Sequence, residues 1–135
     1  MKVFRNQPSL AYILKFFTFT ILLPAFSFAA AFVRVNQVGY PASGSKRAYL
    51  MATGVETGAT FAVKNSSGTT LFSGPIGANL GSWSNSYPDV YALDFSTVTA
   101  AGTYTITVSG PIAASSPTFK IDSAANVYSD RKSVV

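Results

Sequence analysis

The chain has 135 residues and a formal net charge of +5, and it contains neither cysteine nor histidine. Those two absences exclude Ser-His-Asp and Cys-His nucleophiles and ordinary zinc sites. Between Phe32 and Ser129, five basic residues stand against four acidic ones, a balance of +1. This charge is too small and too scattered to bind a phosphate backbone, so we expect no nucleic-acid partner. We also expect no metal and no cofactor.

Residues 1–31 are predicted to be a helical signal peptide. Three basic residues come first, an apolar run follows over residues 16–28, and small residues close the segment. This is the order of an export signal, and cleavage fits after Ala29 or after Ala31. The alternative is a retained membrane anchor, because residues 10–33 approach the roughly 20 apolar residues that cross a bilayer. We expect a secreted protein, extracellular or periplasmic, without membrane contact after cleavage.

Beyond Phe32, apolar and polar residues alternate in short runs. A period of two is the signal of a strand with one buried face. Glycine, proline, asparagine and serine separate the runs, as turns require. About seven short strands at this spacing predict an all-β, immunoglobulin-like (Ig-like) β-sandwich, which we place at residues 32–126. The runs begin near Phe32 and continue over residues 47–52, 60–64, 69–73, 90–95, 103–108 and 118–122.

Two aromatic residues, Trp83 and Tyr87, lie in a Ser/Asn-rich stretch between predicted strands. Flat, exposed aromatic faces would stack on sugar rings, so this pair is a candidate binding site for β-glucan. The alternative is that both rings are core, because tryptophan and tyrosine usually bury most of their area. Tyr91 is in phase with the inward residues of its strand and is predicted to be core.

Tyr104 lies near the start of the penultimate predicted strand, two residues after Gly102. This is the position of the tyrosine corner of Ig-like sandwiches, in which the ring fills core and the hydroxyl bonds to backbone upstream. The alternative is a tyrosine that only favours a strand.

One segment resembles a known family. The sequence Val35-Asn36-Gln37-Val38-Gly39-Tyr40-Pro41, followed by Lys46-Arg47-Ala48, is similar to the start of the N-terminal Ig-like domain of glycoside hydrolase family 9 cellulases. Later elements also fit that family, although many Ig-like sandwiches share them; they are Asp94-Phe95-Ser96, Gly102-Thr103-Tyr104 and Phe119-Lys120-Ile121. The resemblance covers residues 32 to about 129.

Two compatible roles remain open for Asn36, Gln37, Gly39 and Tyr40. The first is structural, because glycine permits a backbone bend closed to other residues and the two amides can bond to backbone at a strand end. The second is docking on the neighbouring catalytic domain that the resemblance implies.

The resemblance implies that the intact protein hydrolyses β-1,4-glucosidic bonds with inversion, using two carboxylates. In that family the catalytic acids belong to a helical domain, and none of their motifs occurs here. We therefore expect no catalytic residue in this chain. Its expected role is a non-catalytic scaffold whose partner is a missing C-terminal catalytic domain of the same polypeptide. The alternative is a stand-alone carbohydrate-binding or adhesion module.

The last residues, 127–135, are interpreted as a truncated linker. Up to Ser129 the sequence fits the link into a catalytic domain, whereas residues 130–135, DRKSVV, break the pattern. Our hypothesis is that this hexapeptide is a sequence artefact, translated from an adapter oligonucleotide; the alternative is a genuine polar tail.

Overall fold

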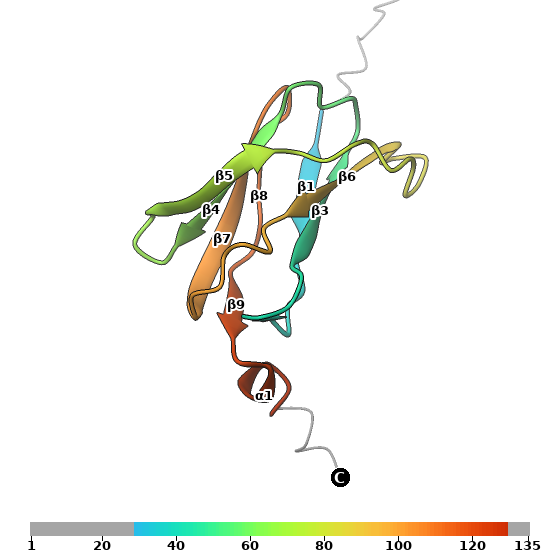
Figure 1. The fold of residues 1–135 in the computed structure, drawn as a ribbon. Coiled ribbons are helices and arrows are strands. Elements are labelled where there is room, and N and C mark those ends of the chain that lie inside the picture. The colour runs from blue at the N-terminus through green and yellow to red at the C-terminus, as the bar shows by residue number, and fades with distance from the viewer. Residues whose placement is uncertain (1–28, 130–135) are drawn as a thin grey trace, which may run out of the picture.

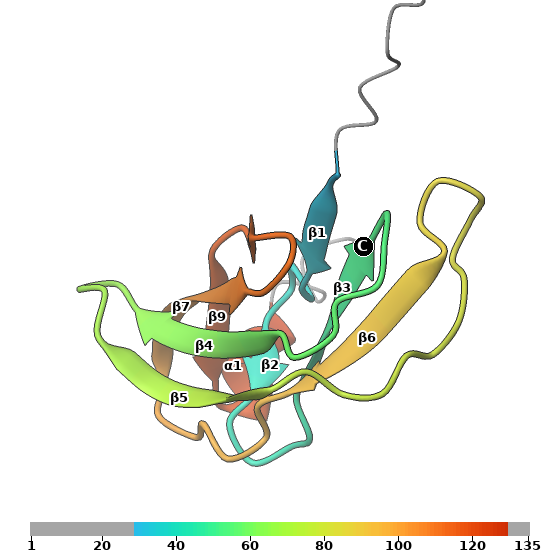
Figure 2. The same ribbon diagram turned by 90° about the horizontal axis from the view of Figure 1, so that it is seen from above.

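A computed structural model describes residues 29–129 of the chain. It confirms the predicted all-β sandwich, since two sheets face each other across one apolar core (Figures 1 and 2). Most of the predicted signal peptide and the 130–135 hexapeptide lie outside the described residues. No helix within residues 29–129 is long and apolar enough to span a membrane.

The smaller sheet has three antiparallel strands in the order β1-β3-β6. These are β1 (Ala31–Arg34), β3 (Arg47–Ala52) and β6 (Asp89–Asp94). The register places Val33 opposite Leu50, and Leu50 opposite Tyr91, in one row that points into the core. The neighbouring row, Phe32, Met51 and Val90, therefore points away from it.

The larger sheet follows the order β2-β9-β7-β4-β5, with β8 also paired to β7. Its strands are β2 (Tyr40–Pro41), β4 (Thr60–Asn65), β5 (Thr70–Pro75), β7 (Gly102–Ser109), β8 (Ala114–Ser115) and β9 (Phe119–Asp122). Strands β8 and β9 both pair with β7, and three residues, Ser116, Pro117 and Thr118, separate them. Among the described residues seven strands have four residues or more, while β2 and β8 have two each.

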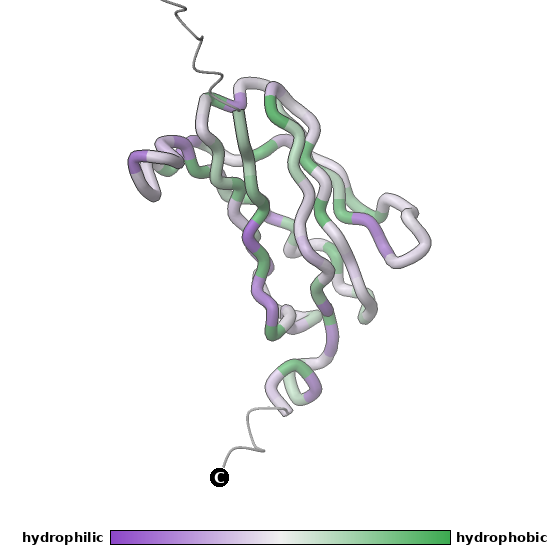
Figure 3. Tube along the Cα trace, turned by 180° about the vertical axis from the view of Figure 1, so that it is seen from behind, coloured by the Kyte–Doolittle hydropathy of each residue, from purple (hydrophilic) through white to green (hydrophobic). Residues whose placement is uncertain are grey.

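The core consists of the inward residues of both sheets, and the period-two reading of the sequence located most of them. Ten apolar residues of the alternating runs are buried: Phe61, Val63, Tyr91, Leu93, Phe95, Tyr104, Ile106, Val108, Phe119 and Ile121. Figure 3 shows apolar colour along much of the strands and polar colour mainly in the loops and near the ends of the described chain. Because no described residue can form a disulfide, this packing and the hydrogen bonds hold the domain together.

One element was not anticipated, a short helix α1 (Ala124–Val127) after β9. Ser123 caps it by accepting a hydrogen bond from the Asn126 N–H, and Val127 is buried. Four residues are too few to show a helical period in the sequence. The helix lies at the pole of the sandwich opposite the start of β1, so the described chain enters and leaves at opposite ends (Figure 1).

Candidate functional site

The Asn36–Tyr40 turn is built around the Tyr40 hydroxyl. This group accepts a hydrogen bond from the Asn36 backbone N–H at 2.9 Å and donates one to the Arg47 carbonyl oxygen at 2.8 Å. The ring meets Phe95 and Phe119 edge-on, with centroids 5.1 and 5.4 Å away. Burial raises the pKa of the Tyr40 hydroxyl. Tyr40 is therefore a core residue that ties the turn to the start of β3.

Gly39 has the conformation that makes this turn possible. Its φ is 109°, and a Cβ there would lie 3.0 Å from the carbonyl oxygen of Lys120. Any other residue would be strained and would push β9 away. Asn36 also acts locally, because its side-chain Oδ1 accepts from the Val38 N–H at 3.0 Å.

The four predicted docking residues therefore do not form one surface. Gly39 and Tyr40 are buried, whereas Asn36 and Gln37 are exposed. Gln37 and Val38 border a shallow hollow of about 580 Å³ that α1 and β9 also line. Only the exposed half of the motif can reach a partner.

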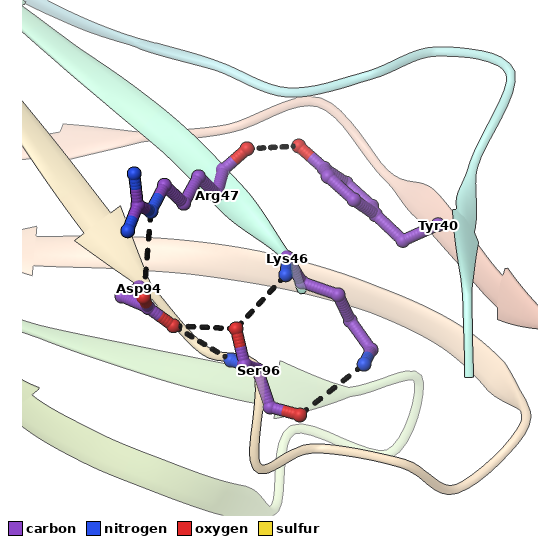
Figure 4. A network of polar contacts seen from close by, with 5 residues as sticks. All are labelled: Tyr40, Lys46, Arg47, Asp94 and Ser96. Carbon is purple, nitrogen blue, oxygen red and sulfur yellow. Dashed lines mark hydrogen bonds and ion pairs between the residues drawn. The ribbon is translucent and has the colours of Figure 1, made fainter. Parts of the chain in front are cut away.

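Beside this turn, the Lys46 side chain is completely buried (Figure 4). Its ammonium donates to three backbone carbonyl oxygens, those of Ala42 at 2.9 Å, Gly44 at 2.8 Å and Ser96 at 3.2 Å. Burial lowers the pKa of Lys46, and the negative charge of Asp94 opposes that shift. Lys46 was identified in the sequence as part of the family motif, but nothing in the sequence indicated that its ammonium group is buried.

Asp94 organises the outer part of the same network. Its Oδ1 accepts from the Ser96 hydroxyl at 2.7 Å and from the Ser96 N–H at 3.0 Å, while Oδ2 lies 3.4 Å from Nε of Arg47. These hydrogen bonds, those from Ser96 first, lower the pKa of the Asp94 carboxyl. The arrangement fixes the end of β6 against the start of β3.

Glu56 is a second buried ionisable residue. Its Oε2 accepts from the Ile112 N–H at 3.2 Å, and its own N–H donates to the Tyr91 hydroxyl at 3.0 Å. Its Oε1 has no hydrogen-bond partner within residues 29–129. This part of the chain also holds no group of three or more His, Cys, Asp or Glu that could bind a metal ion.

Tyr104 is buried in β7, and its hydroxyl donates to the Ala100 carbonyl oxygen at 2.8 Å. This is the backbone contact, four residues upstream, that defines a tyrosine corner. The Cβ position of Gly102 is 3.3 Å from this ring and its hydroxyl, so a larger residue there would crowd it.

The predicted aromatic pair is split by the structure. Trp83 is 73% exposed, whereas Tyr87 is half-buried with its ring edge-on to Phe32, at a centroid distance of 5.7 Å and an interplanar angle of 88°. The two rings come from one loop, residues 76–88, but Tyr87 is engaged with β1. The loop therefore does not present both rings as one flat platform.

Hydrogen bonds hold the 76–88 loop in place beside β6. The N–H groups of Gly77 and Leu80 donate to the Ala92 and Val90 carbonyl oxygens, at 2.9 and 2.7 Å. The Asn79 side chain bonds to Asp89 at 2.6 Å, and the Trp83 N–H bonds to the Tyr87 carbonyl at 3.0 Å. These hydrogen bonds therefore hold the loop tip that carries Trp83 in a fixed position.

Between this loop and the outer face of the small sheet lies an apolar groove of about 540 Å³. Strand side chains form its floor and one wall, and loop residues 80–83 form the other wall; the strand residues are Arg34, Tyr49, Met51 and Val90. Sequence reasoning found only Trp83 of this set. The missed signal is the run Ala48-Tyr49-Leu50-Met51-Ala52, which is apolar on both faces of β3 and so indicates a second covered surface.

Two facing sheets, a tyrosine contact of the corner type and a turn built on Asn36 and Tyr40 define an Ig-like β-sandwich domain. A family model described as the cellulase N-terminal Ig-like domain matches residues 29–111. This match extends over more than half of the chain, so the chain belongs to that family.

Solved structures agree. A protein described as Bacteroides ovatus GH9 superposes with a TM-score of 0.57 and 32% identity over 73% of this chain. A metagenome-derived glycoside hydrolase family 9 endoglucanase superposes with a TM-score of 0.56 and 27% identity over 68% of this chain. The chain spans only 16% and 18% of the length of these two proteins. No curated protein matches the chain.

Proposed function

We propose that this domain is a non-catalytic scaffold of a secreted family 9 cellulase that hydrolyses β-1,4-glucosidic bonds in polysaccharide. The observation that carries the proposal is the family match, together with the small share of the two similar proteins that this chain spans. In this proposal the sandwich packs beside a catalytic domain of the same polypeptide and stabilises it, and an export signal takes the protein out of the cytoplasm.

The polar clusters of the domain favour a scaffold over an enzyme. Lys46 and Asp94 are engaged with neighbouring backbone and Ser96, and the Glu56 side chain is enclosed. Inverting glycoside hydrolysis needs two carboxyl groups separated by about 6.5–9.5 Å across a bound sugar, with room for a water. The acids described above serve the fold, so the chemistry is assigned to the partner domain.

The test begins with the gene. Sequencing beyond the codon of Ser129 should reveal a catalytic domain in the same reading frame. Deleting residues 30–126 from that full-length protein should then lower the unfolding temperature of the catalytic domain. A gene that encodes no further domain, or a catalytic domain of unchanged stability after the deletion, would overturn the proposal.

A second candidate function is binding of β-glucan, and the exposure of Trp83 favours it. Sugar rings can stack on accessible aromatic faces, and the exposed Trp83 ring offers one such face. Retention of the mature chain on cellulose, lost in Trp83→Ala, would establish this function. Equal and negligible retention of both proteins would reject it.

A further inference from the structure

We propose that the groove under the 76–88 loop is the site where the catalytic domain docks. In this proposal the catalytic domain inserts an apolar side chain into the groove and places a carboxylate against Arg34. This inference rests on the proposed scaffold function and goes further by naming the face and the chemistry of contact.

The composition of the groove is the first reason. Trp83 and Leu80 on the loop are 73% and 61% exposed, and Tyr49 on the sheet is 42% exposed. Large apolar side chains gathered at one hollow mark an interaction surface rather than ordinary surface scatter. Tryptophan, tyrosine and arginine are also the residues that contribute most to binding at protein interfaces.

The polarity of the groove distinguishes a protein from a sugar. Met51 and Val90 lie on its sheet side, and the polar groups among its lining side chains are those of Arg34, Tyr49 and Ser82 and the indole N–H of Trp83. Sugar rings need many hydrogen-bond partners, whereas an apolar side chain needs a desolvated pocket of this kind. An inserted side chain of a neighbouring domain therefore suits the groove better than a glucan chain.

Arg34 supplies the charge argument. Within residues 29–129 the only ion pair joins Arg47 to Asp94, so Arg34 has no carboxylate partner there. Arg34 lines the groove beside Tyr49, which is opposite it in the register of β1 and β3. A partner that covers the groove must satisfy this cation, and a carboxylate does so with paired hydrogen bonds.

The size of the partner fits as well. The two similar proteins devote more than four fifths of their length to residues that this chain does not span. The braced loop also offers a preformed surface, so little conformational entropy is lost when it is covered. Both features favour a large, permanently attached domain as occupant over a second copy of this module.

The test uses the full-length protein with two matched pairs of variants. Leu80→Ala removes a groove side chain, and Leu71→Ala removes an equally large side chain, 49% exposed, from β5 of the other sheet. Arg34→Glu reverses the groove charge, and Lys64→Glu reverses a partly exposed charge on β4 of the other sheet. The unfolding temperature of the catalytic domain should fall by about 2–4 °C in each groove variant and stay unchanged in each control.

A second readout is oxidation of Trp83, followed by mass spectrometry. Trp83 should be oxidised severalfold more slowly in the full-length protein than in the mature form of the present chain. Arg34→Glu should restore fast oxidation, and Lys64→Glu should not.

Other results separate the two proposals. If deleting residues 30–126 destabilises the catalytic domain but groove and control variants behave alike, the scaffold function stands and the assigned face is wrong. If the deletion has no effect, the scaffold function itself fails. Protection of Trp83 that requires added cello-oligosaccharide, or that depends on protein concentration, would replace the catalytic domain with a glucan or a second copy and so overturn the inference.

Discussion

Lys46 and Ser96, fifty residues apart in the chain, are joined by two hydrogen bonds. The Lys46 backbone N–H donates to the Ser96 hydroxyl at 2.9 Å, and the Lys46 ammonium donates to the Ser96 carbonyl at 3.2 Å. Lys46 thus connects the start of β3 to the end of β6 (Figure 4). Through Ala42 and Gly44 it also holds the loop that precedes β3.

Lys46→Met should destabilise the domain by about 2 kcal/mol, because three backbone carbonyls lose their charged donor while only one desolvated charge is relieved. Urea unfolding of the mature chain measures this loss. Lys120→Met, at an exposed position of β9, serves as the control and should leave the midpoint unchanged. Equal midpoints for the two variants would show that the buried ammonium does not support the loop.

Tyr40→Phe and Tyr104→Phe should rank in a definite order. The Tyr40 hydroxyl makes two backbone hydrogen bonds, and the Tyr104 hydroxyl makes one. With about 1 kcal/mol for each bond lost, Tyr40→Phe should cost roughly twice as much as Tyr104→Phe. Thermal unfolding of both variants gives the comparison, and the reverse order would contradict the geometry described for the turn.

The Asp94 carboxyl predicts a specific acid sensitivity. Its folded pKa is lowered below the unfolded value of 3.8, chiefly by Ser96. Its ionised form therefore stabilises the fold above about pH 4, and this contribution is lost as the pH falls through the folded pKa. Asp94→Asn and Ser96→Ala should each flatten the pH dependence of stability below about pH 4. Profiles parallel to that of the unmodified chain would reject this assignment.

Gly110 should tolerate no side chain, although it is exposed. A Cβ there would lie 2.5 Å from Cβ of Ala59 and 3.0 Å from Oε2 of Glu56. Gly110→Ala should therefore cost about 1–3 kcal/mol through overpacking. At Gly54 a Cβ would meet nothing within 4 Å, so Gly54→Ala should be neutral or slightly stabilising. The midpoints of denaturant unfolding of the two variants test this. A Gly110→Ala midpoint equal to that of the unsubstituted chain would contradict the prediction.

Export should end with cleavage after Ala29 rather than after Ala31. Ala30 exchanges two hydrogen bonds with Thr53, each of 2.9 Å, and Ala31 is the first residue of β1, opposite Ala52. Cleavage after Ala31 would remove all of these contacts, and cleavage after Ala29 keeps them. The intact mass of the exported protein should place its first residue at Ala30; a mature chain beginning at Phe32 would contradict this.

The sequence predicted the sandwich well, because burial in a two-layer sheet imposes a period of two. Phe61, Val63, Ile106 and Val108 were all placed inward by that pattern and are buried. Helix α1 escaped notice because its stability comes from a Ser123 cap and one buried valine, not from a repeat.

The surfaces were harder to foresee. The buried positions of Lys46 and Glu56 depend on loop carbonyls and on β-strands distant in sequence, and residue type alone argues for exposure. The groove joins β1, β3, β6 and a loop that begins more than forty residues after β1 and more than twenty after β3, so its members share no local motif. Trp83 was found because an aromatic residue among serines and asparagines contrasts with its neighbours.

The hydrogen bonds from Gly77 and Leu80 to Ala92 and Val90 have one more consequence. They occupy outward carbonyls of β6, the terminal strand of the small sheet, which would otherwise invite pairing with a strand from another molecule. The 76–88 loop, which forms one wall of the groove, therefore also blocks edge-to-edge association of β6 with other molecules. We expect a shortened loop to make the protein less soluble and more prone to form fibrils.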